Sequence, residues 1–134
     1  MEMQNSKVLK GILTLLGLNL VGIGSWRLFA PISFAKNNAM DLNNQISLIN
    51  EGRGAGGEIV AIGVLIILGI FIKKLTYTSS IIGPVLYLGF GVARLFSFLV
   101  DGHPGEMAVT AMIGEFVMGG IGLFALIKYS EKKQ

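Results

Sequence analysis

The chain has 134 residues, of which 52% are hydrophobic and 14% are charged, and its formal net charge is +3. Soluble domains carry about 25% charged residues, and a soluble protein with so little charge would expose apolar patches and aggregate. The composition therefore predicts one membrane domain over residues 1–134. The basic residues form no stripe with interleaved aromatic residues, which argues against a nucleic-acid partner. With no cysteine and one histidine, we expect no disulfide, metal centre or other cofactor.

Four apolar stretches are long enough to cross a hydrocarbon layer of about 30 Å, which takes about 20 helical residues. In chain order they cover about residues 10–30, 55–72, 77–100 and 107–127. None shows sustained two-residue alternation, so we expect helices rather than barrel strands. The first stretch also resembles a secretory signal peptide, but its length and Arg27 near its end favour a retained helix. The predicted fold is an all-α membrane four-helix bundle.

The distribution of basic residues predicts the orientation of the bundle. One side holds the N-terminus, the second connection and the C-terminus, with Lys7, Lys10, Lys73, Lys74, Lys128, Lys132 and Lys133. The other side holds Arg27, Lys36 and Arg53. Because positive residues concentrate on the cytoplasmic side, we expect both termini in the cytoplasm and a multi-pass protein of a bacterial inner membrane.

The only long connection, residues 31–54, joins the first two spans on the outer side. A connection of this length is usually functional or has structure of its own. The apolar positions from Leu42 to Ile49 predict a short interfacial helix that leads into the second span.

Three ionisable residues are clear cases well inside the spans, each on a different helix: Glu58, Arg94 and Glu115. Each costs about 2.5–3.5 kcal/mol at mid-membrane, so such residues face inward and pair. From a rise of 1.5 Å per residue, they lie about 6, 10 and 12 Å below the outer ends of their helices. The similar depth predicts a charged layer in the outer half of the membrane.

Other residues extend this layer. Tyr87 and Asp101 lie seven residues on either side of Arg94 and share its helical stripe. Glu51 and Arg53 precede the second span. One interpretation is that Arg94 forms a buried ion pair with Glu58 or with Glu115, which fixes the helix register. A second is an outward-facing polar pocket for a headgroup, a small polar solute or a proton, and a third is chance spacing. The layer has four acids, Glu51, Glu58, Asp101 and Glu115, against the two arginines Arg53 and Arg94. Unless Arg27 also joins, the surplus acids would bind a cation, lie in water or hold protons.

Small residues predict where helices approach closely. Gly57 and Ala61 form such a face on the second helix, and Gly119 belongs to one on the fourth.

The glycine-rich stretch 52–57 follows no predicted strand and lacks a lysine-serine ending, which argues against a nucleotide-binding loop. His103 lies between Asp101 and a proline, and we expect it to be a turn residue rather than a ligand.

Several motifs together carry a family resemblance. They are Phe29-Ala30-Pro31, Glu51-x-Arg53-x-x-x-Gly57, Gly91-x-x-Arg94, Asp101-Gly102-x-Pro104 and Glu115. In this combination the chain resembles the DUF4345 family of small bacterial four-helix membrane proteins, which is similar in layout to DoxX-like proteins. The resemblance covers about residues 7–128 and implies the fold, but no activity. Glu58 departs from it, at a position where a small or apolar residue is expected.

These observations favour a binding or transport protein with an outward-facing polar pocket, whose ligand is a membrane lipid headgroup or a small polar solute. The alternative is a non-catalytic accessory subunit, in a homo-oligomer or a larger membrane-protein complex, whose charges only fix helix packing. A membrane enzyme that uses a glutamate holding its proton at neutral pH ranks lower. A proton-coupled exporter also ranks low, because the first helix has no acid between Lys10 and Arg27.

Overall fold

The computed structural model describes residues 2–131 and is dominated by four long helices. These are α1 (Lys7–Phe29), α3 (Ile46–Phe71), α4 (Lys73–Asp101) and α5 (Glu106–Tyr129). Each is long and apolar enough to cross a membrane, which confirms the prediction of an all-α four-helix bundle. At 1.5 Å per residue, even the 23 residues of α1 reach about 35 Å.

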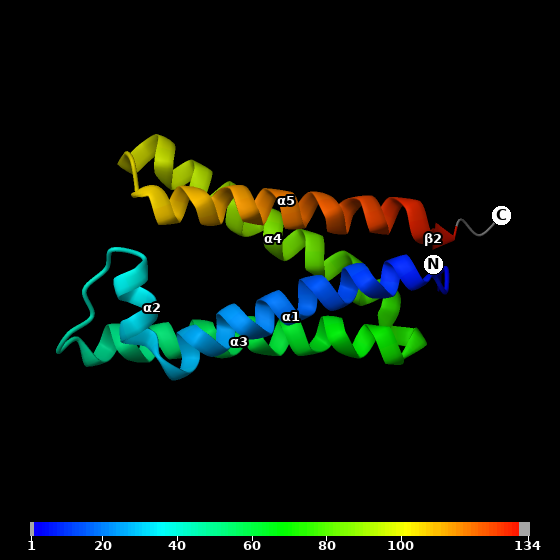
Figure 1. Ribbon diagram of the computed structural model, residues 1–134, viewed down its shortest axis with the longest axis horizontal. Coiled ribbons are helices and arrows are strands. Elements are labelled where there is room, and N and C mark those ends of the chain that lie inside the picture. Colours follow the sequence, from blue (N-terminus) through cyan, green and yellow to red (C-terminus); the bar gives the residue numbers. More distant parts are fainter. Residues whose placement is uncertain (1, 132–134) are drawn as a thin grey trace.

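The helices form two antiparallel pairs, with α1 packed on α3 and α4 packed on α5 (Figure 1). The pairs meet at the end that holds both chain termini, here called the terminal end, and diverge at the opposite end, the loop end. At the terminal end a short strand β1 (Glu2–Met3) pairs antiparallel with β2 (Ser130–Glu131). Both termini therefore lie on one side, and their cytoplasmic location stays a prediction.

Glycine brings α1 and α3 into backbone contact. Gly17 and Gly24 of α1 face Gly63 and Gly56 of α3, and all four are buried. A Cβ atom added to Gly24 would lie 2.8 Å from the backbone nitrogen of Val60 and 2.9 Å from the carbonyl oxygen of Gly56. The predicted close-packing face on Gly57 was wrong, because a Cβ there would meet nothing within 4 Å. The interface uses the glycines spaced seven residues apart, which repeat along one helix face.

Small residues also join α4 to α5. A Cβ on Gly119 would lie 2.7 Å from the Leu88 side chain, and one on Gly91 would lie 3.2 Å from the Phe116 ring. Both glycines are buried. They therefore set the distance between the two helices that carry Arg94 and Glu115.

A tight corner holds the two pairs together at the terminal end. Only Ile72 separates α3 from α4. Thr76 Oγ1 donates to the Gly69 carbonyl at 2.8 Å, and Ser79 Oγ donates to the Leu65 carbonyl at 3.0 Å. Nearby, the apolar core gathers a buried stripe of α1 that consists of Leu9, Leu13, Leu16 and Leu20.

The long connection at the loop end contains a helix, but not at the predicted position. The seven-residue helix α2 (Pro31–Asn37) begins at a proline, whose fixed φ suits the first helical turn. The stretch from Leu42 to Ile49 is no separate helix, because α3 begins at Ile46. Asn44 has a φ of 61°, which interrupts the helical conformation just before that start.

Candidate functional site

Arg94 of α4 and Glu115 of α5 form an ion pair across the α4–α5 interface. Arg94 Nε donates to Glu115 Oε1 at 2.9 Å and to Oε2 at 3.0 Å. Arg94 is seven residues from the end of α4 and Glu115 is nine from the start of α5. At 1.5 Å per residue they therefore lie about 10 and 13 Å below the loop end. One of the two pairings proposed for Arg94 is thus the one that forms.

The ion pair is not buried, contrary to expectation. The Arg94 side chain is 40% exposed and that of Glu115 is 14% exposed. Among the residues whose burial is described, the buried polar ones are Ser79 and Ser80, and none is charged. The α1–α3 pair diverges from α4 and α5 toward the loop end (Figure 1), which leaves Arg94 open to the cavity between the pairs. Its two terminal nitrogens have no hydrogen-bond partner in the described part of the chain.

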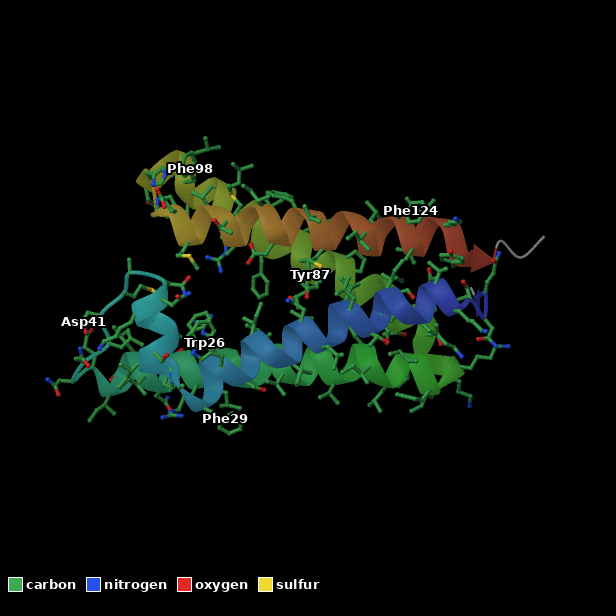
Figure 2. The ribbon with its side chains drawn as sticks, in the orientation of Figure 1. Trp26, Phe29, Asp41, Tyr87, Phe98 and Phe124 are labelled. Atoms are coloured by element: carbon green, nitrogen blue, oxygen red, sulfur yellow. The ribbon has the colours of Figure 1, made fainter. Side chains whose placement is uncertain are left out.

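A cavity of about 330 Å³ lies where the helix pairs diverge. Its polar lining includes Arg94, Glu115, Arg27 and Asn19. Its apolar lining includes Leu20, Ile23, Ile59, Phe90, Met107 and Met118. In Figure 2, Trp26 and Tyr87 lie in the space between the two pairs, and both also line the cavity. The cavity therefore combines an apolar wall with a localised group of charged and amide side chains.

Tyr87 closes the cavity toward the terminal end. Its side chain is buried, and its hydroxyl lies 2.7 Å from Asn19 Oδ1 and 3.0 Å from the Leu16 carbonyl oxygen of α1. The hydroxyl has one hydrogen to donate, which these two acceptors share. Tyr87 lies seven residues before Arg94 on α4, as the helical stripe predicted. It thus links α4 to α1 on the core side of the ion pair.

Arg27 and aromatic residues form the wall on the α1–α2 side. The Arg27 guanidinium carbon lies 5.6 Å from the Phe34 ring centroid, within range of a cation–π contact. Trp26 packs edge-on against Phe34 at 5.4 Å, and its indole nitrogen donates to Ser33 Oγ at 3.4 Å. No ion pair forms at Arg27 in the described structure. Arg27 is therefore a cation in the cavity wall without an acidic partner.

Glu58 is not brought to the ion pair, although its estimated depth is similar. It is exposed on α3, while the next residue, Ile59, is buried and lines the cavity. Successive helical residues point about 100° apart, because a turn takes 3.6 residues. Since Gly56 and Gly63 face α1, Glu58 must point away from the bundle.

Arg53 and Glu51 also lie outside this cavity. Arg53 is exposed and its Nη1 donates to the Leu28 carbonyl at 2.6 Å. That carbonyl belongs to the last turn of α1, whose carbonyls lack helical partners and carry partial negative charge. Glu51 lines a second cavity of about 230 Å³, which it shares with Arg27. Arg27 therefore borders both cavities.

Asp101 and His103 make local contacts at the loop end. Asp101 Oδ2 accepts a hydrogen bond from Ser97 Oγ at 2.8 Å, and His103 Nδ1 accepts one from the Gly105 backbone nitrogen at 3.1 Å. His103 thus organises the turn between α4 and α5. In the described chain, no group of three or more His, Cys, Asp or Glu side chains is placed to hold a metal ion.

Sequence reasoning missed several residues of the cavity. Trp26, Phe34 and Asn19 were not singled out, and Arg27 was considered only as a possible addition to the charged layer. A signal was present for two of them. Asn19 is an amide within an otherwise apolar span, and Arg27 follows the buried Leu20 by seven residues on the same stripe.

Comparison with known families supplies the remaining finding. A model of the DUF4345 family, described as a domain of unknown function, matches residues 8–126. No curated protein and no solved structure matches the chain. The match spans all four long helices, including the two that hold Arg94 and Glu115. The chain therefore belongs to the DUF4345 family.

Proposed function

We propose that this membrane protein binds an amphipathic molecule in the cavity between its two helix pairs. The polar end of the ligand lies against the Arg94–Glu115 pair, and its apolar part lies against the aliphatic and aromatic wall. The observation that carries the proposal is the mixed lining of the cavity, which combines charged side chains with mostly apolar ones. Ligand sites are commonly concave, of about 300–1,000 Å³, and mostly apolar with a few polar groups.

The opening of the cavity supports a ligand from the bilayer. The exposed residues of its lining include Ile23 and Trp26 of α1 and Met107, Thr110 and Gly114 of α5. Both helices are candidate membrane spans. An opening between two spans faces lipid, so an acyl chain reaches the cavity without crossing water. If the termini face the cytoplasm, the cavity lies in the outer half of the membrane.

The protein contains its own reporter of binding, because Trp26 is the single tryptophan and lines the cavity. We would titrate the detergent-solubilised protein with a brominated fatty acid and, separately, with the uncharged monoacylglycerol of the same chain. Bromine quenches indole fluorescence at short range, so a bound chain lowers the Trp26 emission. Saturable quenching by at least one probe, reversed by the unbrominated compound, is the expected result.

Two glycine variants separate cavity binding from general contact with detergent or lipid. Gly114 lines the cavity and Gly120 does not, yet both are exposed on α5 and a Cβ on either would meet nothing within 4 Å. Gly114→Phe fills the cavity and should abolish saturable quenching, whereas Gly120→Phe should leave it intact. Equal quenching of both variants, or no saturable quenching of the parent protein by either probe, would refute the proposal.

One observation favours the second candidate, an accessory subunit of a membrane complex. Glu58 is exposed halfway along a candidate span and has no partner in the described part of the chain. A carboxylate that faces lipid is costly, and a cationic residue on a helix of another protein would remove that cost. The test is whether a partner protein co-purifies with the chain. A partner that is lost from Glu58→Gln and kept by the control Gly120→Phe would support this function. An unchanged complex in Glu58→Gln would rule out this role.

A further inference from the structure

We propose that the polar end of the ligand is an oxyanion, a phosphate or carboxylate headgroup, held jointly by Arg94 and Arg27. This inference rests on the proposed function and names the chemical class of its ligand. Three observations support it: the net positive charge of the cavity lining, the N–H groups of the two arginines that have no acceptor in the described part of the chain, and the contacts that orient each guanidinium, with Glu115 for Arg94 and with Phe34 for Arg27.

The charged side chains of the cavity do not balance. Arg27 and Arg94 contribute two positive charges and Glu115 contributes one negative charge, so the lining has a net charge of +1. Glu51, which lines the second cavity together with Arg27, does not line this one. An anionic headgroup would neutralise the surplus, whereas a cationic headgroup would add to it. In a low-dielectric span this difference is larger than in water.

The ion pair presents Arg94 in a suitable way. Glu115 engages only Nε, with both of its oxygens. The two Nη groups remain as a planar fork of four N–H donors, and the side chain lines the cavity. Such a fork binds two oxygens of one phosphate or carboxylate. Glu115 thereby acts as a positioning residue, because it holds the guanidinium plane without occupying the fork.

Arg27 and two amides complete the set of donors. The Phe34 ring holds the Arg27 guanidinium at 5.6 Å, a contact that leaves its N–H groups free for an anion. Asn19 offers its amide N–H₂, since its oxygen is the atom that lies beside the Tyr87 hydroxyl. Asn37 of α2 lines the cavity as well. Arg27 of α1 and Arg94 of α4 belong to different helix pairs, so an oxyanion bound by both would connect the two pairs.

The test is competition against the better-binding brominated probe, read by Trp26 fluorescence. The competitors share one chain and differ in charge: dodecyl phosphate, dodecanol and dodecylammonium, with inorganic phosphate as a chainless control. We expect dodecyl phosphate to compete at a concentration about tenfold or more below that of dodecanol, because a charged hydrogen bond adds this much affinity. Dodecylammonium should be the weakest of the three.

The matched variants are Arg27→Gln and Lys36→Gln. Both remove one positive charge near the loop end, but Lys36 is exposed on α2 and does not line the cavity. Arg27→Gln leaves the Arg94–Glu115 pair intact and should remove most of the preference for phosphate over dodecanol, while Lys36→Gln should keep it. Arg94→Lys, which retains the charge and loses the fork, should weaken dodecyl phosphate selectively.

The outcomes separate this inference from the proposed function. Equal potency of dodecyl phosphate and dodecanol, with binding still blocked by Gly114→Phe, would overturn the oxyanion and leave the amphipathic ligand. An equal loss of preference in Arg27→Gln and Lys36→Gln would show that net charge alone attracts the anion, which also overturns the inference. If inorganic phosphate competes as well as dodecyl phosphate, the ligand of the site is a free anion and not a lipid headgroup. Absence of any competition or probe binding would remove both proposals.

Discussion

The two residues of the ion pair should differ in what their removal costs. Arg94→Gln leaves the Glu115 carboxylate uncompensated at 14% exposure, whereas Glu115→Gln leaves the Arg94 guanidinium at 40% exposure. Removing one member of a buried pair costs about 3–5 kcal/mol, and an exposed pair contributes only about 0.2–1 kcal/mol. The exposed part of Arg94 lines the cavity beside Arg27 and Asn19, where water in the ligand-free protein would hydrate an unpaired guanidinium, whereas Glu115 is more enclosed. Between these limits, we therefore expect Arg94→Gln to lower the free energy of unfolding by about 2–3 kcal/mol and Glu115→Gln by about 1 kcal/mol.

The double variant provides the decisive comparison. Because Arg94→Gln with Glu115→Gln leaves no unpaired charge at the site, it should be more stable than Arg94→Gln alone, by about 1 kcal/mol or more. The assay is reversible unfolding of the ligand-free protein in mixed micelles, with the three variants and the parent measured in parallel. If Glu115→Gln is the most destabilising, or if the double variant is no more stable than Arg94→Gln, the reasoning from exposure is refuted.

Three further predictions follow from the packing. Gly56→Leu should lower the free energy of unfolding by about 3 kcal/mol or more, because a Cβ at this position would lie 2.6 Å from the Leu28 backbone nitrogen. Gly57→Leu is the control and should change the free energy of unfolding by less than about 1 kcal/mol, because a Cβ there meets nothing within 4 Å. Tyr87→Phe should cost about 1–2 kcal/mol through its lost hydrogen bond to α1, and no loss would mean that the hydroxyl is not bonded there. Glu58→Leu should raise the stability of the isolated protein in a bilayer, and a clear loss would show that its carboxylate stabilises the fold.

The apolar runs were sufficient to predict the four helices, because span length and the absence of two-residue alternation leave little choice in a membrane. Depth was also predictable, since the rise per residue places Arg94 and Glu115 at matching levels and they do pair. The direction in which a side chain points was not predicted. Glu58 was predicted about 6 Å below the end of its helix, but α3 begins at Ile46, which puts Glu58 about 18 Å from that end. The rotation of α3 is set by Gly56 and Gly63 against α1.

That rotation was in principle available from the sequence. Gly17 and Gly24 of the first helix have the same seven-residue spacing as Gly56 and Gly63 of the second. The prediction instead used Gly57, because four glycines occur between residues 52 and 57 and a local pattern cannot choose among them. The position of α2 was missed for a similar reason, since its only strong signal is Pro31 at the first helical position.

The cavity itself follows from a change of residue type along each core stripe. On α1, buried leucines continue through Leu20, and the next stripe positions, Ile23 and Arg27, line the cavity. On α4, the buried Tyr87 gives way to Arg94 after two turns, at the level where α5 presents Glu115. The helices thus stop supplying mutual core residues at one level, and contacts between the α1–α3 pair and the α4–α5 pair no longer hold the two pairs together there. A bound amphiphile would fill this space with the missing apolar contacts, so saturating ligand should raise the thermal stability of the parent protein and not that of Gly114→Phe.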